Sequence, residues 1–146
     1  AFMKAHEYHT NMSYVRGLTP VAIGTTGTGK TSLVVDRQGF DAVEIVINIG
    51  SITATAAVIT PVVLEGDVTG AMTSAADADL IGTELEAAVI AGTPRTSGVN
   101  KNCVRKIGYR GIKRYVGCRL VNTVTAGPLV DITFALGNPA LVPTTR

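Results

Sequence analysis

A strict alternation of side chains over residues 42 to 49 constrains the fold more than any other feature of the sequence. Every second residue from Val43 to Ile49 is apolar and β-branched, and Glu44 and Asn48 are among the residues between them. A period of two is that of a β-strand with one buried face. Each buried valine or isoleucine stabilises a fold by about 1.5–3 kcal/mol, so a charge in place of Ile47 is expected to unfold the domain.

The same alternation recurs in residues 115 to 121 and in residues 129 to 136. Glycine, proline and threonine turns separate these segments from shorter strand-like runs, and no convincing long helix lies between them. Roughly seven short strands punctuated in this way predict an all-β fold, an antiparallel β-sandwich that is jelly-roll-like or a related barrel. The residues predicted to fill its core are Val43, Ile45, Ile47, Ile49, Val116, Cys118, Leu120, Val130, Ile132 and Phe134.

The length of 146 residues suits one domain with a real core. Residues 1 to 18 show neither helix nor strand periodicity and are predicted to form an N-terminal arm. Residues 19 to 137 are then the sandwich domain. Residues 138 to 146 carry Pro139 and Pro143 and are predicted as an extended C-terminal tail.

Residues 103 to 109 and 115 to 121 are predicted to pair as the two arms of a hairpin. Placing Tyr109 opposite Tyr115 would keep Cys103 and Cys118 apart, so we expect free thiols, as in a reducing compartment. The hairpin would concentrate positive charge at one end of the molecule, which makes that end a candidate contact. Its basic residues are Arg105, Lys106, Arg110, Lys113 and Arg114.

The composition favours contacts through uncharged surface. Charged residues make up 16% of the chain, against about 25% in a typical domain, so serine, threonine, alanine and glycine must cover much of the surface. A net charge of +2 gives no general argument for nucleic acid or a membrane as a partner. The mean hydropathy is +0.31, yet no apolar run approaches the roughly 18 residues of a spanning helix. The first residues lack the pattern of a signal peptide, so we expect synthesis in a cytoplasm.

Residues 24 to 31 match the phosphate-binding loop pattern, with Gly24, Gly29, Lys30 and Thr31 at the required spacing. That loop holds phosphate at the N-terminus of a helix. Gly39 follows only eight positions after Thr31, and the residues between them include adjacent valines and no helical apolar face. We therefore interpret the segment as a turn between extended stretches, and nucleotide binding is a remote alternative.

No arrangement of residues predicts an enzyme, a metal site or a cofactor. His6 and His9 are three positions apart, not four as in a zinc-binding helix. The carboxylates between residues 77 and 86 lack the glycine turn and the final glutamate of a calcium loop. We interpret that region as a solvated polar loop.

Several segments resemble small structural proteins of tailed bacteriophages, which are encoded among the head genes and usually lack an assigned activity. The resemblance covers roughly residues 33 to 143, and its most specific part is the Ile-Gly-Tyr-x-Gly-x-Lys-Arg-Tyr-Val block from Ile107 to Val116. The other matching segments are Asp36-Arg-Gln-Gly-Phe-Asp41, Thr60-Pro61 with Leu64-Glu65, Ala76-Asp-Ala-Asp-Leu-Ile-Gly-Thr83 and the closing Gly137-Asn-Pro139.

The resemblance implies a virion component, assembled in the host cytoplasm and located at the capsid surface. Our first hypothesis is a decoration (cement) protein that binds the major capsid protein and copies of itself, as a monomer or a trimer before docking. A head-tail joining or tail protein is the alternative. The predicted contact residues are Phe2, Tyr8, Tyr14 and Arg16 in the arm, and Arg110, Lys113 and Arg114 in the basic turn.

Overall fold

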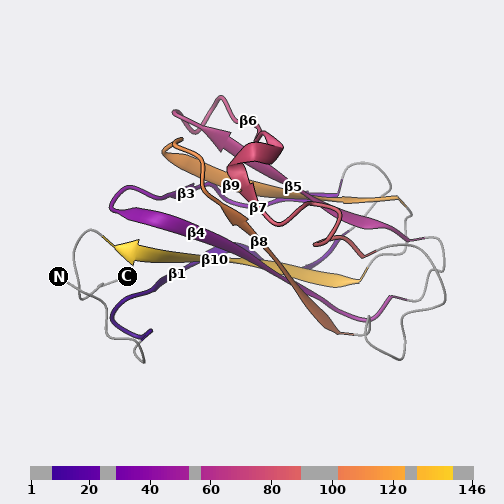
Figure 1. Cartoon of the computed structure of the whole chain (residues 1–146). Coiled ribbons are helices and arrows are strands. Elements are labelled where there is room, and N and C mark those ends of the chain that lie inside the picture. Colours follow the sequence, from indigo (N-terminus) through magenta and orange to yellow (C-terminus); the bar gives the residue numbers. More distant parts are fainter. Residues whose placement is uncertain (1–7, 24–28, 53–56, 90–101, 124–127, 140–146) are drawn as a thin grey trace.

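A computed structural model of the chain describes residues 8–23, 29–52, 57–89, 102–123 and 128–139. Almost all of its regular structure is β, in two antiparallel sheets that pack face to face (Figure 1). The predicted all-β sandwich is therefore confirmed.

The first sheet contains five strands in the order β1, β10, β4, β8, β7. Their bounds are Ser13–Ala22, Leu129–Pro139, Phe40–Ile49, Cys103–Tyr109 and Leu80–Ile81. The second sheet has the order β2, β9, β5, β6, and β3 also pairs with β9. Their bounds are Lys30–Thr31, Tyr115–Asn122, Ile59–Gly66, Thr73–Ser74 and, for β3, Val35–Asp36. One short 3₁₀ helix, η1, spans Asp77–Asp79.

The strand pairs are nested along the chain. The first strand pairs with the last, β2 and β3 pair with β9, β4 pairs with β8, and β5 pairs with β6. The chain thus behaves as a long ribbon folded at the β5–β6 connection and rolled into two sheets, which is the jelly-roll arrangement. From β4 onward, consecutive long strands consequently lie in opposite sheets: β4, β8 and β10 belong to the first sheet, and β5 and β9 belong to the second.

The nesting overturns the predicted hairpin of residues 103 to 121. β8 pairs with β4 in the first sheet, whereas β9 pairs with β5 in the second, so the segment between them crosses from sheet to sheet. The alternation of apolar and polar residues within a strand identifies the face that turns toward the core, but it does not identify the strand with which it pairs. Cys103 and Cys118 are free, as predicted, and both are buried; they lie on strands of different sheets.

The predicted N-terminal arm is wrong for residues 13 to 18, because these residues belong to β1. The register of β1 against β10 shifts between Arg16 and Leu18 and again between Leu18 and Val21, which destroys the period of two that sequence inspection relies on. Gly17 lies at the first shift, where an added Cβ would come within 2.6 Å of the Phe134 ring. β10 in turn extends to Pro139, and residues 140–146 of the predicted tail lie outside the described residues.

The core lies between the two sheets, and all ten predicted core residues are buried in it. Tyr109, at the end of β8, is a large buried side chain that the prediction missed. Other buried residues beyond the predicted set include Ile23, Val35, Ile52, Ile59, Val63, Leu80, Ile107 and Leu136.

Candidate contact surfaces

The outer face of the first sheet, turned away from the core, is the first candidate surface. The strand register aligns one row across this face, from Tyr14 on β1 through Ala135 and Glu44 to Gly108 on β8 and Ile81 on β7. Residues opposite each other on antiparallel strands are near neighbours on one face. Tyr14 is 60% exposed, and Ile81 at the other end of the row is exposed as well.

Arg16 lies in the next row of the same face, with Thr133, Val46 and Lys106. Two predicted contact residues, Tyr14 and Arg16, are therefore held on a strand of the sandwich, not on an arm. Glu44, in the first row, is close to Lys106 in the second. Burial raises the pKa of the Glu44 carboxyl, and the charge of Lys106 acts in the opposite direction.

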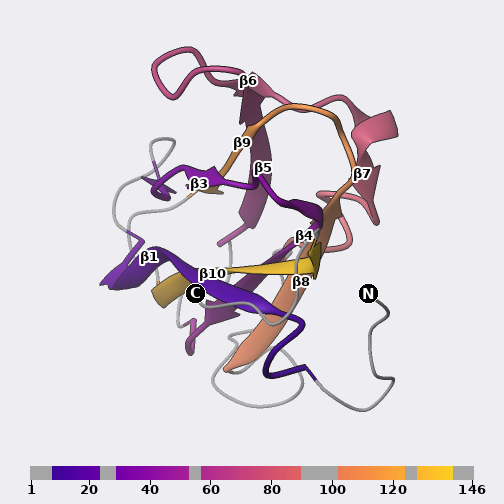
Figure 2. The ribbon, with the colours of Figure 1, turned by 90° about the vertical axis from the view of Figure 1, so that its left-hand side faces the viewer.

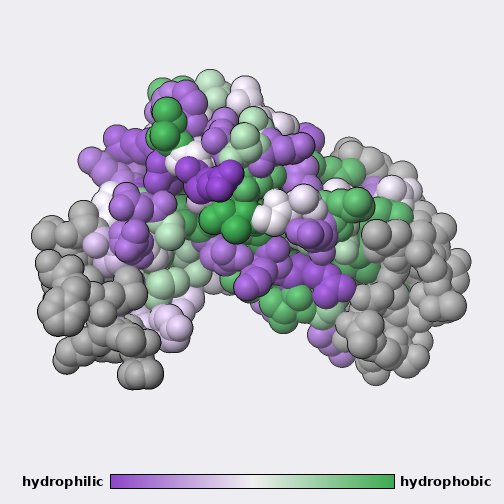
Figure 3. Space-filling view, in the orientation of Figure 1, coloured by the Kyte–Doolittle hydropathy of each residue, from purple (hydrophilic) through white to green (hydrophobic). Residues whose placement is uncertain are grey.

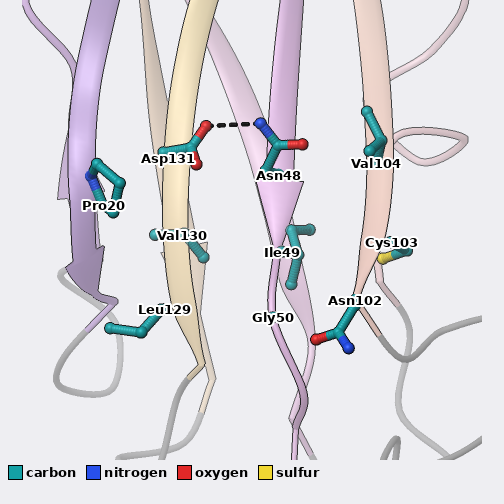
Figure 4. Close-up of a pocket in the computed structure, with 10 residues that line it drawn as sticks. All are labelled: Pro20, Asn48, Ile49, Gly50, Asn102, Cys103, Val104, Leu129, Val130 and Asp131. Atoms are coloured by element: carbon teal, nitrogen blue, oxygen red, sulfur yellow. Dashed lines mark hydrogen bonds between the residues drawn. The ribbon is translucent and has the colours of Figure 1, made fainter.

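A shallow cavity of about 280 Å³ hollows the far end of this outer face. Asn48 and Asp131 point toward each other across β4 and β10, and the Asn48 amide Nδ2 donates a hydrogen bond of 2.7 Å to Asp131 Oδ1 (Figure 4). Apolar side chains flank this polar pair, among them Pro20, Val104 and Leu129. In the view of Figure 3, hydrophobic and hydrophilic residues are interspersed over the described surface, and neither kind forms a continuous cover.

The second candidate surface is the end face, formed where the chain crosses between the sheets. We define it by Asp36, Arg37, Phe40, Asp41, Asp67, Ile112, Lys113 and Arg114. Figure 2 looks onto this end, and the crossing from β8 to β9 appears there as an orange arc. Because β3 leads into β4 at the same end, segments far apart in the sequence meet here.

Arg37 joins those segments. Its guanidinium donates to three backbone carbonyls: Nε to Lys113 O at 2.5 Å, Nη2 to Gly111 O at 2.8 Å and Nη1 to Phe40 O at 3.2 Å. The same guanidinium lies 5.7 Å from the centre of the Tyr109 ring. A rigid planar fork of donors suits this role, so Arg37 fixes the crossing segment against the β3–β4 turn.

Tyr109 supports the crossing from inside. Its hydroxyl donates to Glu65 Oε2 at 2.6 Å and accepts the Lys113 backbone N–H at 3.1 Å. Burial, together with the hydrogen bond to Glu65, raises the pKa of Tyr109 well above its usual value. Gly111 packs on the same ring, since an added Cβ would lie 2.4 Å from the Tyr109 hydroxyl oxygen. The Ile107–Val116 block thus contains the residues that shape the crossing.

The positive charge predicted for this end is largely compensated by acidic partners. Lys113 Nζ forms an ion pair of 2.5 Å with Asp67. Arg114 binds Asp36 through two hydrogen bonds, Nε to Oδ1 at 3.1 Å and Nη2 to Oδ2 at 2.8 Å. The expectation of a concentrated positive patch is therefore wrong for Lys113 and Arg114, because their acidic partners come from distant segments that the hairpin interpretation did not bring close.

Ile112 is the surface residue that sequence inspection missed. It is 89% exposed at the middle of the crossing, between the anchored residues Gly111 and Lys113. The sequence pattern does not single it out, because individual apolar side chains are common on protein surfaces.

The remaining predicted contact residues are separate from one another. Arg110 is exposed, and its Nε donates to Ala78 O at 3.0 Å. Tyr8 is also exposed, and its carbonyl accepts the backbone N–H groups of Asn11 and Met12. Phe2 lies outside the described residues.

The phosphate-loop pattern leads into a strand. Lys30 and Thr31 form β2, which pairs with β9, so the stretch after the predicted turn begins as a strand. Gly29 has φ 56° and packs so tightly on β9 that an added Cβ would lie 1.6 Å from Leu120 O. Residues 24 to 28 lie outside the described residues, but the helix that a phosphate loop requires does not follow Thr31.

Two carboxylates of the predicted polar loop, Glu84 and Glu86, have structural roles. Glu84 Oε1 accepts the Val63 backbone N–H at 2.8 Å. Thr83 and Glu86 exchange reciprocal hydrogen bonds of 3.0 Å between side chain and backbone, as in a capping box. Within the described residues, no group of three or more histidine, cysteine, aspartate or glutamate side chains could hold a metal ion.

Neither cysteine offers an accessible reactive thiol, since both are buried. Burial, with a smaller effect of the Glu84 charge, raises the pKa of Cys118 to about 12, which keeps this thiol protonated. In the part of the chain that the structure describes, we find no helix with the length and apolar character needed to cross a membrane.

Comparisons with known proteins identify no family. No protein-family model matches the chain, and no curated protein matches it. Among solved structures, it is similar to a Clostridium thermocellum endo-1,4-β-D-xylanase 10B, solved as CBM22-1–GH10 modules complexed with xylohexaose. The TM-score is 0.42 at 10% sequence identity, and the match covers 95% of this chain and 29% of that chain. A similarity at this level says nothing about what this chain binds.

Proposed function

We propose that the protein is a structural component of a tailed-phage virion, a decoration protein that binds the outside of the capsid and stabilises the shell. The observation that carries this proposal is the outer face of the first sheet. Tyr14 and Arg16 lie there with three exposed apolar side chains, Ile81, Val104 and Leu129. Tyrosine and arginine are enriched where protein interfaces gain most of their binding energy.

A rigid sheet suits attachment to a lattice of identical subunits. The backbone of β1 and β10 is already ordered, so binding through these strands does not also pay for ordering a loop, which lowers the cost of association. The affinity of each copy for the shell can be modest, since many copies that also touch one another add avidity. The sequence resemblance to phage head-gene products gives the class of partner, the major capsid protein.

The fold by itself does not choose this function. Jelly rolls serve as viral capsid domains, lectins and cupins, and one fold hosts many activities. A head-tail joining or tail role within the virion is the second candidate, and it differs from decoration in stoichiometry. A decoration protein follows the symmetry of the shell and is present in on the order of hundreds of copies, whereas a connector ring has about six or twelve.

Counting copies in purified particles therefore tests the proposal. Quantitative mass spectrometry against the major capsid protein should give a number that matches the shell lattice. A ratio that fits a single ring would contradict the decoration role, and absence from the particle would contradict a virion role altogether.

The contact face can be tested by adding purified protein back to shells that lack it. Arg16→Glu should reduce binding by about tenfold or more, because it reverses a charge at the proposed interface. Arg119→Glu is the matched control, since Arg119 is equally a strand arginine exposed on the outer side of the second sheet. Equal binding by both variants would exclude the first sheet as the contact face.

A further inference from the structure

We propose that a hollow around Glu44, on the outer face of the first sheet, binds an arginine side chain of the protein to which this face docks. That the docked protein is the capsid subunit rests on the proposed function, whereas the binding of an arginine side chain does not. The residues that line the hollow include Met12, Asp41, Ala42, Glu44, Ile81 and Arg110.

Small residues create the hollow, which has a volume of about 310 Å³. An added Cβ at Gly108 on β8 would come within 2.9 Å of Ile81 Cβ, and one at Gly137 on β10 would lie 2.9 Å from Met12 Sδ. Met12 thus borders the hollow beside β10 and Ile81 borders it beside β8. Ala42 on β4 is exposed between these two apolar side chains.

The Glu44 carboxylate is the unsatisfied group in this hollow. Glu44 is half-buried, and its Oε2 would lie 3.2 Å from a Cβ at Gly108. Among the described residues, no hydrogen bond or ion pair reaches this carboxylate, and Lys106 acts on it only from a distance. Burial accordingly raises the pKa of Glu44. Three other half-buried carboxylates each accept a hydrogen bond, namely Glu65, Glu84 and Asp131.

Charge selects a cationic occupant. The charged residues that line the hollow are two anions, Glu44 and Asp41, and one cation, Arg110, whose Nε is directed to Ala78 O. An anionic group would meet the Glu44 carboxylate in a site with little water. An apolar group would complete the burial of that carboxylate without giving it a donor, which costs free energy.

Arginine fits this site better than lysine does. Both oxygens of Glu44 are without a hydrogen-bond donor, and a guanidinium can donate to both at once. A guanidinium is also less strongly hydrated than an ammonium, so it loses less on entering a half-buried site. The aliphatic part of the side chain would pack against Met12 and Ile81.

Nuclear magnetic resonance titration of the isotope-labelled full chain tests the binding. The probe is N-acetyl-arginine methylamide, and its neutral counterpart with citrulline in place of arginine has nearly the same shape. The arginine probe should shift the backbone amide signals of Ile81 and Gly108 in a saturable way at millimolar concentration. The citrulline probe should bind about tenfold more weakly. Equal binding of the two probes, or tighter binding of the lysine analogue, would overturn the proposal.

Two variants separate the charge from the space. Glu44→Gln should weaken binding of the arginine probe about tenfold, and Asp131→Asn, which removes a half-buried carboxylate from the far end of the same face, should bind like the wild type. Ala42→Leu keeps the carboxylate but fills the hollow from an exposed position, so it should also abolish binding. Wild-type affinity in Glu44→Gln or in Ala42→Leu would contradict the site.

Addition of the purified variants to shells that lack the protein tests whose arginine is bound. Glu44→Gln should attach more weakly than Asp131→Asn. If Glu44→Gln loses the probe but attaches as well as Asp131→Asn, the arginine does not belong to the shell. That result would leave the copy number, which tests the decoration role, unchanged. Loss of the decoration role would in turn leave the binding of the arginine probe to the isolated protein intact.

Discussion

The centre of the first sheet and the crossing from β8 to β9 differ in how much of their structure the sequence predicts. Alternation in β4 and β10 predicts which residues are buried, whereas the sequence of the crossing does not predict its course. β4 and β10 pair over nearly their full lengths, and their inward residues form the middle of the core. The crossing is held by Arg37 and Glu65, which lie 74 and 44 residues away from the groups they bind. Local pattern determines burial, whereas distant side chains determine where a connection goes.

The difference predicts that the two regions respond to substitution in different ways. Changes in β4 should affect the whole domain. Changes at the crossing should cost part of the stability and leave the sheets intact.

The largest effect is expected for Ile47→Asp. Ile47 is fully buried at the centre of β4, where an unpaired carboxylate would cost at least as much as the whole net stability of a small domain, about 5–15 kcal/mol. Circular dichroism should show no cooperative unfolding transition. Val46→Thr, on the outer side of the same strand, should keep the transition. A cooperative transition in Ile47→Asp would show that this strand is not central to the core.

Gly111→Ala should destabilise the protein by about 1–3 kcal/mol, because the new Cβ would overlap the Tyr109 hydroxyl and force the crossing to move. Gly70→Ala is the control, since nothing lies within 4 Å of a Cβ at Gly70. Chemical denaturation of the two variants should separate them clearly. Equal stabilities would mean that the ring of Tyr109 does not pack on Gly111.

Tyr109→Phe should cost about 1–2 kcal/mol at neutral pH, since it removes one hydrogen bond to Glu65 and one from the Lys113 N–H. The raised pKa of Tyr109 means that the folded protein holds this proton more tightly than the unfolded chain. Stability from that proton is complete below the unfolded value of about 10 and falls as the pH rises above it. The advantage of the wild type over Tyr109→Phe should therefore shrink above that pH, and a constant difference would contradict the assignment.

Arg114→Gln should have the smallest effect, about 0–1 kcal/mol, because its pair with Asp36 is partly exposed to solvent. The loss should diminish at high salt, where exposed charges are screened. Chemical denaturation of Arg114→Gln and the wild type at low and high ionic strength measures the loss of stability and its dependence on salt. A large, salt-independent loss would show that Arg114 is needed for packing, through its contact with the Tyr115 ring, more than for its charge.

Much of the fold could be predicted from the sequence because burial is a local property. The inward residues of β4, β9 and β10 were identified by their period of two, and all are buried. β1 could not be found in this way, because the register shifts near Gly17 remove the period.

Strand partners and contact residues were harder to predict, for a physical reason. Adjacent strands in a chain often pair, but a jelly roll pairs strands that are far apart, and nothing in β8 or β9 alone reveals this. The acidic partners of Lys113 and Arg114 follow from that topology, as does the exposure of Ile112. The chemistry of Tyr14 and Arg16 predicts a contact role but does not reveal that both residues lie on a strand.

The nested pairing is the claim on which both surfaces depend, and cross-strand nuclear Overhauser effects between backbone protons test it most directly. The jelly roll predicts contacts of Lys106 with Val46 and of Cys118 with Val63. A hairpin would instead bring Lys106 opposite Cys118. Observing that contact, with the first two missing, would contradict the crossing between the sheets and the end face it creates.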